Sequence, residues 1–279
     1  MYDVVIIGKG PAGISAFLYT SKANLKTLLI GKAETFSRES LQEQSEAQEI
    51  SLGVERLEEE VISIEKKDFF EVITANNKFI AKAVLIATGQ TNKKLEVDRL
   101  SDFEGKGVSY CTSCDGFFYN DLKVGVVGFK DYAIYEAIEL MEYTKDITIF
   151  TNERALELTD NFKKQSEIFK INHKGIKALE GNDFLEKIIF NDGTNEVIDG
   201  IFLAYESAAT ADFANKLGLV TNGESIKVDI NQQTNVKGVF AAGDCTGDFI
   251  QIVNAVDQGA MAGKSTVEYV RSIREKIKC

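Results

Sequence analysis

The sequence predicts an α/β protein made of two Rossmann-like three-layer domains, with the second domain inserted into the first. Residues 4–7 are an apolar, β-branched run of the kind that forms a strand covered on both faces. A glycine-rich turn and a helical pattern follow, and the same order of strand, turn and helix returns 120 residues later, from Gly8 to Gly128. Residues 234–244, a buried run ending in Gly-Asp, return the chain to the first domain. We expect a first domain from residues 1–104 and 207–279 and a central domain from residues 105–206.

The first turn has the form GxGxxG and reads Gly8-Lys9-Gly10-Pro11-Ala12-Gly13. Its first glycine permits the tight turn, the second lets a pyrophosphate approach the backbone, and the third lets the helix pack on the strand. The N-terminus of the helix adds unpaired amides and the positive end of a dipole. In its place between a strand and a helix, this motif predicts a dinucleotide site.

Further strand and helix patterns complete the first domain. Strands are expected at residues 27–30, 61–65, 69–74 and 83–89, a solvated helix over residues 39–60, and a long helix over residues 251–277. The strand at 27–30 ends in Gly31-Lys32, without the acid that commonly holds a ribose, and leaves Glu34 as an alternative. Thr88-Gly89 alone is an ordinary strand exit. Paired with the distant Gly243-Asp244, it is typical of a flavin-binding domain.

The second turn departs from the motif of the first. Lys130 stands where the first copy has Gly10, and Phe129 precedes it. A side chain at this point occupies the space that a pyrophosphate needs. The next strand, residues 146–150, leads to Glu153, which would repel the 2′-phosphate of NADPH but could hold a free ribose. The pattern disfavours NADPH and leaves NADH, another nucleotide or a second flavin open.

Two cysteines separated by two residues, Cys111 and Cys114, can close a small disulfide ring or open to a dithiol. Asp115 follows directly and is the acid closest to them in sequence. A zinc site would need further ligands, but the other two cysteines stand alone, and the sole histidine, His173, lies in a lysine-rich segment expected at the surface. Polar neighbours argue against an inert, buried pair. We therefore predict a redox-active pair and no metal.

Composition narrows the class of protein. The chain has 279 residues, 44% of them hydrophobic, and a formal net charge of −11. The acidic balance disfavours nucleic acid and anionic membranes as partners, and no apolar run approaches the roughly 20 residues that span a bilayer. A strand-like run starts at Tyr2, so we expect no signal peptide. Four cysteines with one catalytic pair suit a reducing cytoplasm.

Together these motifs resemble the low-molecular-weight thioredoxin reductase family over residues 2–269. The matching segments are residues 8–13, 19–25, 87–89, 111–119 and 238–244. The most specific of them reads Cys-Thr-Ser-Cys-Asp-Gly-Phe-Phe-Tyr from Cys111. The resemblance implies an FAD-binding domain made from both chain ends, a central domain that carries the dithiol, and a homodimer.

The resemblance also implies residue roles. Cys114 would be the sulfur nearest the flavin, Cys111 would attack the disulfide of thioredoxin, and Asp115 would manage the proton. The residues implied in FAD binding are Gly8, Gly10, Pro11, Ala12, Gly13, Gly31, Lys32, Val61, Ala87, Thr88, Gly89, Gly243, Asp244, Gln251 and Ile252.

The departures from the family concern its NADPH site. The second GxGxxA motif and the His-Arg-Arg cluster are absent, and Gly128-Phe129-Lys130 and Thr151-Asn152-Glu153 stand in their places. These losses are similar to those of the clostridial-type ferredoxin-dependent flavin thioredoxin reductases. The sequence thus indicates a thioredoxin reductase that takes electrons from reduced ferredoxin. An NADH-dependent disulfide reductase is the main alternative, and a non-catalytic flavin-binding interaction protein is another. Candidate basic residues for ferredoxin docking are Lys93, Lys94 and Arg99, although a solvated lysine loop explains them more simply.

Overall fold

The computed structural model describes residues 1–31, 55–89, 95–205, 210–223, 225–247 and 251–276. The chain divides into two compact units, unit 1 from Met1–Thr91 with Ala209–Cys279 and unit 2 from Asn92–Ala208. The first boundary therefore falls before Asn92 rather than after residue 104, because Leu100 and Phe103 pack in the core of unit 2. The second differs from the expected 206/207 by two residues and lies in a stretch outside the described residues.

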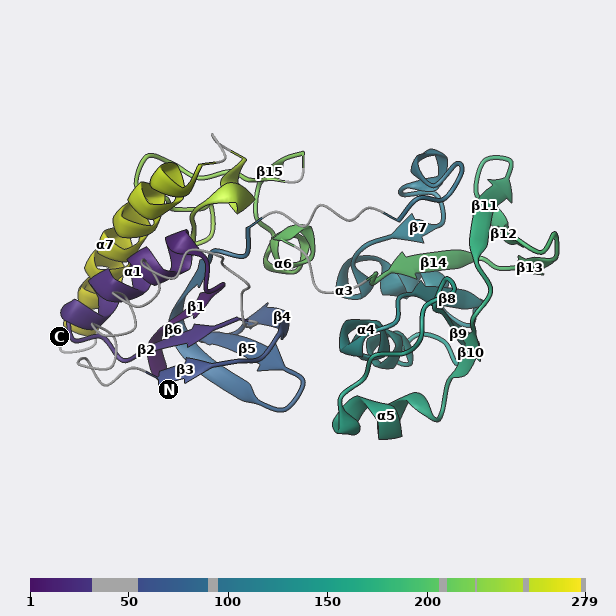
Figure 1. Cartoon of the computed structure of the whole chain (residues 1–279), viewed down its shortest axis with the longest axis horizontal. Helices are drawn as coiled ribbons and strands as arrows, with labels where there is room; N and C mark the ends of the chain where they lie inside the picture. Colours follow the sequence, from purple (N-terminus) through teal and green to yellow (C-terminus); the bar gives the residue numbers. More distant parts are fainter. Residues whose placement is uncertain (32–54, 90–94, 206–209, 224, 248–250, 277–279) are drawn as a thin grey trace. The chain divides into compact units, whose positions relative to one another are not determined.

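Unit 1 is built on a seven-stranded sheet with the order β3-β2-β1-β6-β5-β4, in which β17 also pairs with β6 (Figure 1). The strands are β1 (Tyr2–Ile7), β2 (Thr27–Ile30), β3 (Glu55–Leu57), β4 (Val61–Lys66), β5 (Phe70–Thr74), β6 (Lys78–Ile86) and β17 (Val239–Ala241). β3, β2, β1, β6 and β17 pair in parallel, whereas β4 and β5 form an antiparallel extension. The carboxyl ends of the parallel strands therefore share one edge, where the glycine turn lies.

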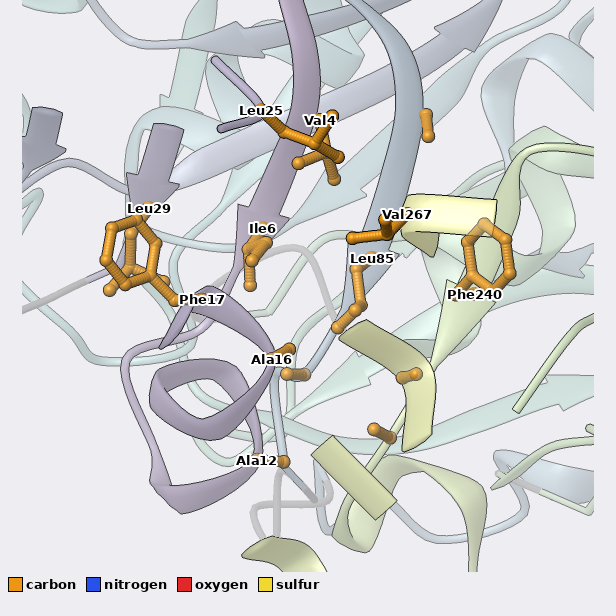
Figure 2. Packing of buried hydrophobic residues seen from close by; sticks show 14 of the residues in the cluster. Val4, Ile6, Ala12, Ala16, Phe17, Leu25, Leu29, Leu85, Phe240 and Val267 are labelled. Carbon is orange, nitrogen blue, oxygen red and sulfur yellow. The ribbon is translucent and has the colours of Figure 1, made fainter. Parts of the chain in front are cut away.

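The first and last helices of the chain pack together against this sheet. They are α1 (Pro11–Lys22) and α7 (Ile252–Lys276), and α6 (Thr210–Leu217) contacts β4. Small residues permit the close approach, since a Cβ built on Gly259 would lie 2.2 Å from the carbonyl oxygen of Ala12. Figure 2 shows Ile6 and Leu85 from neighbouring strands in one buried cluster with Phe17 of α1. This cluster fixes both chain ends in one unit.

Unit 2 has two sheets around its own core. A parallel sheet has the order β10-β9-β8-β14-β7 and an antiparallel sheet the order β11-β12-β13. The strands are β7 (Val108–Ser109), β8 (Val124–Val127), β9 (Ile147–Phe150), β10 (Lys170–Asn172), β11 (Ile176–Gly181), β12 (Leu185–Phe190), β13 (Asn195–Val197) and β14 (Gly200–Leu203). Buried side chains of both sheets, such as Phe150 and Phe190, meet in this core.

The helices of unit 2 include the one that carries the cysteine pair. They are η1 (Ser101–Phe103), α3 (Thr112–Asp115), η2 (Gly116–Tyr119), α4 (Asp131–Leu140) and α5 (Asp160–Ser166). α3 contacts both η2 and α4. The predicted α/β class with Rossmann-like sheets is thereby confirmed.

Two sequence expectations in unit 1 need correction. The helix expected over residues 39–60 lies mostly outside the described residues, and its described end is strand β3, which pairs with β2 because it completes the parallel edge. The run at residues 234–244 is a strand only at β17, since turns precede it. The remaining described elements are β15 (Thr221–Asn222), β16 (Ser225–Ile226) and η3 (Asp244–Thr246).

Within the described part of the chain, no helix has the length and apolar character needed to cross a membrane. The same residues contain no cluster of three or more histidine, cysteine and acidic side chains suited to a metal ion.

Candidate functional site

The first glycine turn joins β1 to α1 in unit 1. Gly8 has a φ of +113°, and a Cβ there would lie 2.0 Å from the carbonyl oxygen of Ala87. A Cβ on Gly13 would lie 1.9 Å from the carbonyl oxygen of Gly8. α1 begins at Pro11 with Gly10 as its N-cap and no side-chain cap. The turn is therefore as tight as the motif requires, and its N-cap residue offers no side-chain acceptor to the amides of the first helical turn.

Residues from the C-terminal part of the chain join this turn. Gly243 has a φ of +82°, and a Cβ there would lie 2.9 Å from the Cβ of Ala12. The Gly243 amide donates a 2.7 Å hydrogen bond to Oε1 of Gln258 on α7. Asp244 follows at the start of η3. The structure therefore brings the two predicted landmarks, more than 200 residues apart in sequence, to one edge of the sheet.

The other predicted cofactor residues fall into three groups. Gly31 lies beside the turn, since a Cβ there would lie 3.0 Å from Cγ of Lys9. Val61 begins β4 and is buried. Along the chain, Thr88 and Gly89 follow β6, Gln251 precedes α7, Ile252 begins α7, and Lys32 lies outside the described residues.

Sequence reasoning missed two features near this turn. The side chain of Lys9, only 12% exposed, forms a 3.1 Å ion pair with Glu58, which follows β3. Gln258 is 5% exposed and also accepts a hydrogen bond from Thr246. Gln258 stood out as a polar residue in the small-residue stripe of the last helix, whereas nothing in the sequence links Lys9 to Glu58.

The second turn joins β8 to α4 in unit 2 and is covered by its own chain. Phe129 is fully buried, and its carbonyl oxygen accepts a 2.8 Å hydrogen bond from the amide of Glu157. Lys130 forms an isolated parallel bridge with Glu157, and their side chains lie 3.9 Å apart. The guanidinium of Arg154 lies 4.6 Å from the ring centroid of Phe129. The segment around residues 154–157 thus lies along the turn.

The acid after β9 is engaged elsewhere. Oε1 of Glu153 accepts a hydrogen bond of 3.2 Å from the side chain of Asn191. A Cβ on Gly175 would lie 2.4 Å from the same oxygen, so the carboxylate lies close to the backbone there. His173 is exposed, as expected, and its Nδ1 lies 3.0 Å from Oγ1 of Thr151. Glu153 is therefore held within unit 2 by a partner from the turn after β12.

Cys111 and Cys114 form a disulfide at the start of α3. Cys111 is the N-cap of this helix and is 3% exposed, whereas Cys114 is exposed. The amides of Cys114 and Asp115 both donate to the carbonyl oxygen of Cys111. A short helical turn therefore closes the ring and presents the second cysteine at the surface.

Polar groups surround the disulfide. Oδ2 of Asp115 accepts a 2.6 Å hydrogen bond from the hydroxyl of Ser109, and this hydroxyl in turn accepts from the amide of Cys111 at 3.1 Å. Burial and, second, the nearby Asp115 charge raise the pKa of Tyr119. The buried Glu136 of α4 accepts from the amide of Thr112. Glu136 lies among the apolar residues of that helix, and this position in the sequence could have indicated a buried acid.

An apolar surface adjoins the disulfide. The rings of Phe117 and Phe118, in η2, lie 3.9 Å apart by their centroids and are 53% and 66% exposed. Tyr110, which precedes the pair, is 37% exposed. Exposed aromatic side chains grouped in this way mark a surface suited to contact with another protein.

Comparisons with known proteins agree with this geometry. The model of the pyridine nucleotide-disulphide oxidoreductase family matches residues 2–259. A thioredoxin reductase from Peptoclostridium litorale is 32% identical, with 98% of each chain covered.

Solved structures are similar as well. The atypical thioredoxin reductase TRi from Desulfovibrio vulgaris Hildenborough has a TM-score of 0.93 at 36% identity, covering 98% of this chain and 99% of that one. A ferredoxin-flavin thioredoxin reductase from Clostridium acetobutylicum has a TM-score of 0.69 at 25% identity, covering 97% and 98%. A glycine turn fit for a dinucleotide, a CxxC disulfide and these matches lead to one conclusion. The chain belongs to the pyridine nucleotide-disulphide oxidoreductase family and, within it, to the thioredoxin reductases.

Proposed function

We propose that this chain is an FAD-dependent thioredoxin-disulfide reductase that receives its electrons from reduced ferredoxin rather than from NADPH. The disulfide of Cys111 and Cys114 supports the first half of the proposal. The single observation that carries the second half is the covered turn of unit 2, where a nicotinamide nucleotide would otherwise bind.

FAD is the cofactor of the family, and the residues of unit 1 fit it. Gly10 carries no side chain at the point where a pyrophosphate would approach, and α1 begins beside it at Pro11, where the amides of Ala12 and Gly13 would face the phosphates. Asp244 stands at the same edge of the sheet, where its carboxylate would accept from a ribityl hydroxyl. The other residues named for the site would line it through Gly31, the residues 87–89 and the start of α7. When bound, FAD supplies the electron pair that opens the disulfide.

The covered second turn argues against a nicotinamide donor. The backbone of Glu157 bonds to this turn, and Lys130 places a side chain where unit 1 has Gly10. Asp131 adds a carboxylate to the first turn of α4, where a diphosphate would seek a positive helix end. Glu153, the acid that could hold an NADH ribose, is bonded to Asn191. These contacts favour a donor that needs no nucleotide site.

An anaerobic donor screen tests the electron source. NADH, NADPH, reduced ferredoxin and reduced flavodoxin are each mixed with the yellow enzyme, and thioredoxin thiols are counted. We expect thiols with reduced ferredoxin and none with either nicotinamide. Bleaching of the ~450 nm flavin band by NADH with thiol formation would establish the alternative NADH-dependent reductase. Bleaching by dithiothreitol but by none of the four donors would favour the non-catalytic flavin protein.

The thiol chemistry needs only residues of unit 2 and the acceptor. Once the pair is reduced, a Cys111 thiolate attacks the disulfide of thioredoxin and forms a mixed disulfide, and Cys114 then attacks Cys111 and releases the thioredoxin dithiol. Asp115, placed beside the pair by Ser109, would give a proton to the departing thiolate. The exposed Phe117 and Phe118 offer thioredoxin an apolar contact beside the pair.

Which of the two cysteines attacks thioredoxin can be tested with single variants. In the structure Cys111 is buried and Cys114 is exposed. Attack by Cys111 requires that its sulfur become accessible when the ring opens. A thioredoxin lacking its resolving cysteine, with its remaining cysteine activated as a mixed disulfide with thionitrobenzoate, should be trapped by the Cys114→Ser variant with release of thionitrobenzoate, and not by Cys111→Ser. Both variants should stay yellow and fail to turn over. Trapping by Cys111→Ser alone would reverse the roles of the two cysteines, and turnover by either variant would remove the pair from the mechanism.

Partners and assembly complete the proposal. The homodimer would use exposed apolar side chains on α1 and α7, namely Tyr19, Val253 and Val256, and light scattering of the purified protein tests it. The cytoplasm remains the proposed compartment.

Of the basic residues named for ferredoxin docking, Lys93 and Lys94 lie outside the described residues, and Arg99 pairs with Asp102 at 3.0 Å. Salt-sensitive turnover would support electrostatic docking.

A further inference from the structure

A buried carboxylate lies behind the active-site helix. Glu136 of α4 is 2% exposed, and its Oε2 accepts a 3.3 Å hydrogen bond from the amide of Thr112. That nitrogen belongs to the peptide bond that joins Cys111 to Thr112. The acid is therefore separated from the buried cysteine by no more than the first peptide unit of α3.

The position matters because a cysteine at a helix N-terminus is ordinarily acidified by the amides of the first turn. Here one of those amides, that of Thr112, donates to the carboxyl group of Glu136. Other titratable groups near the active-site helix include Asp115 on the helix itself, Tyr119 on the following turn, Tyr143 beside Gly116 and Tyr132 on α4, and Glu104 accepts from the hydroxyl of Tyr110 before the pair. Negative charges close to a thiol disfavour its thiolate and raise its pKa.

We propose that Glu136 is a positioning residue that disfavours ionisation of the Cys111 thiol without preventing it, and thereby makes the Cys111–Cys114 pair a stronger reductant. A disulfide becomes more oxidising when its reduced form is stabilised by an acidic thiolate, so a charge that opposes the thiolate has the reverse effect. The proposal deepens the proposed function and rests on the same cysteine pair, but it concerns the pair's own equilibrium and not its partners.

Dithiothreitol is the reductant for the test. The S–S bond breaks, each sulfur gains one electron and one proton, and dithiothreitol loses the same two electrons and two protons as it closes into a cyclic disulfide. Glu136→Gln removes the charge and keeps an oxygen that can accept from Thr112. Glu142→Gln is the matched control, because Glu142 is exposed just after α4 and its change in net charge is identical.

The first readout is the pH profile of alkylation of the reduced, FAD-loaded enzyme by iodoacetamide, followed peptide by peptide by mass spectrometry. The half-point of Cys111 should fall by about one pH unit in Glu136→Gln and stay unchanged in Glu142→Gln. In the second readout, equilibrium with dithiothreitol above the lowered pKa, Glu136→Gln should be up to about tenfold less reducing, which corresponds to about 30 mV. At acidic pH the variant and the unmodified enzyme should converge.

Three outcomes would overturn the proposal. An unchanged half-point in Glu136→Gln, even with a lower melting temperature, would reduce Glu136 to a structural role. An equal shift in Glu142→Gln would show a general effect of net charge. If Glu136→Gln does not fold, the unmodified enzyme decides: we expect a Cys111 pKa at or above the ~8.5 of a free cysteine, and a value below about 7.5 contradicts the idea. Neither readout uses thioredoxin or ferredoxin, so failure of the proposed function would leave this result standing.

Discussion

The β1–α1 and β8–α4 turns are two copies of one design, and they differ at the point where a nucleotide would approach. In both, a Cβ on the first glycine would strike a carbonyl oxygen of the chain that follows the neighbouring strand, at 2.0 Å for Gly8 and 2.2 Å for Gly128. The N-caps also share an extended backbone, with φ −70° and ψ 179° at Gly10 and φ −117° and ψ 178° at Lys130. The first glycine of each turn therefore preserves the backbone fold. The residue two positions later, Gly10 in one copy and Lys130 in the other, determines whether a side chain blocks the approach of a ligand.

Electrostatics separates the copies further. The first turn of α1 has no acidic residue, whereas α4 begins with Asp131, whose carboxylate accepts a 2.8 Å hydrogen bond from the amide of Thr159. A carboxylate at that end offsets the helix dipole that would attract a phosphate. In the second copy, the start of α4 is thus bonded to the start of α5.

The largest expected effect comes from giving the first turn the residue of the second. Gly10→Lys fits the backbone, because φ at Gly10 is −70°, but its side chain would occupy the pyrophosphate position. We expect FAD affinity to fall at least about a hundredfold, since a bulky group there blocks the approach to the amides of α1. Flavin fluorescence titration of the apoprotein measures the loss.

Lys130→Gly is the reciprocal control. It should leave FAD affinity within about twofold, because the turn proposed to bind FAD belongs to unit 1. An equal loss of FAD in both variants would mean that the two turns do not differ in the way described, and a Gly10→Lys protein that purifies fully yellow would contradict the assignment of the first turn.

A smaller effect, on the free energy of unfolding, is expected from the aspartates at the start of β1 and before β8. Asp3 of β1 is buried and bonds to Lys82, to Arg274 and to the amide of Lys26. Burial by itself would raise its pKa, but these partners lower it below the usual 3.8. Asp3→Asn should lower the free energy of unfolding by about 2 kcal/mol near pH 7, and the difference should shrink as pH falls below about 4, where the folded-state carboxylate protonates.

Asp199, which accepts from the amide of Lys123 before β8, provides the matched comparison. It is exposed, so Asp199→Asn should cost less than about 1 kcal/mol. Urea unfolding of both variants across pH 3–8 measures the pair. A cost for Asp199→Asn as large as that for Asp3→Asn would show that burial is not what distinguishes the two anchors.

An effect confined to pH above 9 concerns Cys245, which is buried after β17 and is not part of the disulfide. Burial raises the pKa of its thiol to about 12, from 9.0. The stabilisation from keeping it neutral is complete below pH 9 and is lost as pH rises toward 12, by about 1.4 kcal/mol for each unit above pH 9. The stability of the unmodified protein should therefore fall more steeply between pH 9 and 11 than that of Cys245→Ala. Parallel slopes in urea unfolding would contradict this.

Local patterns predicted much of the fold. The motif at Gly8, the apolar strands on both sides of it and the repeat at Gly128 were sufficient for the α/β class, because each depends on nearest neighbours in sequence. The short strand β3 was missed, since its first two residues, Glu55 and Arg56, are polar and exposed and only pairing with β2 makes the segment a strand. The start of unit 2 was placed too late because Phe103 is apolar in either domain, and only packing assigns it to the second.

The candidate site likewise has features that the sequence predicted and features that only the tertiary structure showed. The sequence alone determined the chemistry: a CxxC pair with Asp115 beside it, one intact glycine turn and one altered copy. Only the tertiary structure decided what contacts those residues. It brought Gln258 to Gly243, placed Glu136 behind Cys111, and laid Glu157 along the altered turn. Such contacts join residues 15 to 28 positions apart in the chain and depend on how helices pack on sheets, which no local pattern encodes.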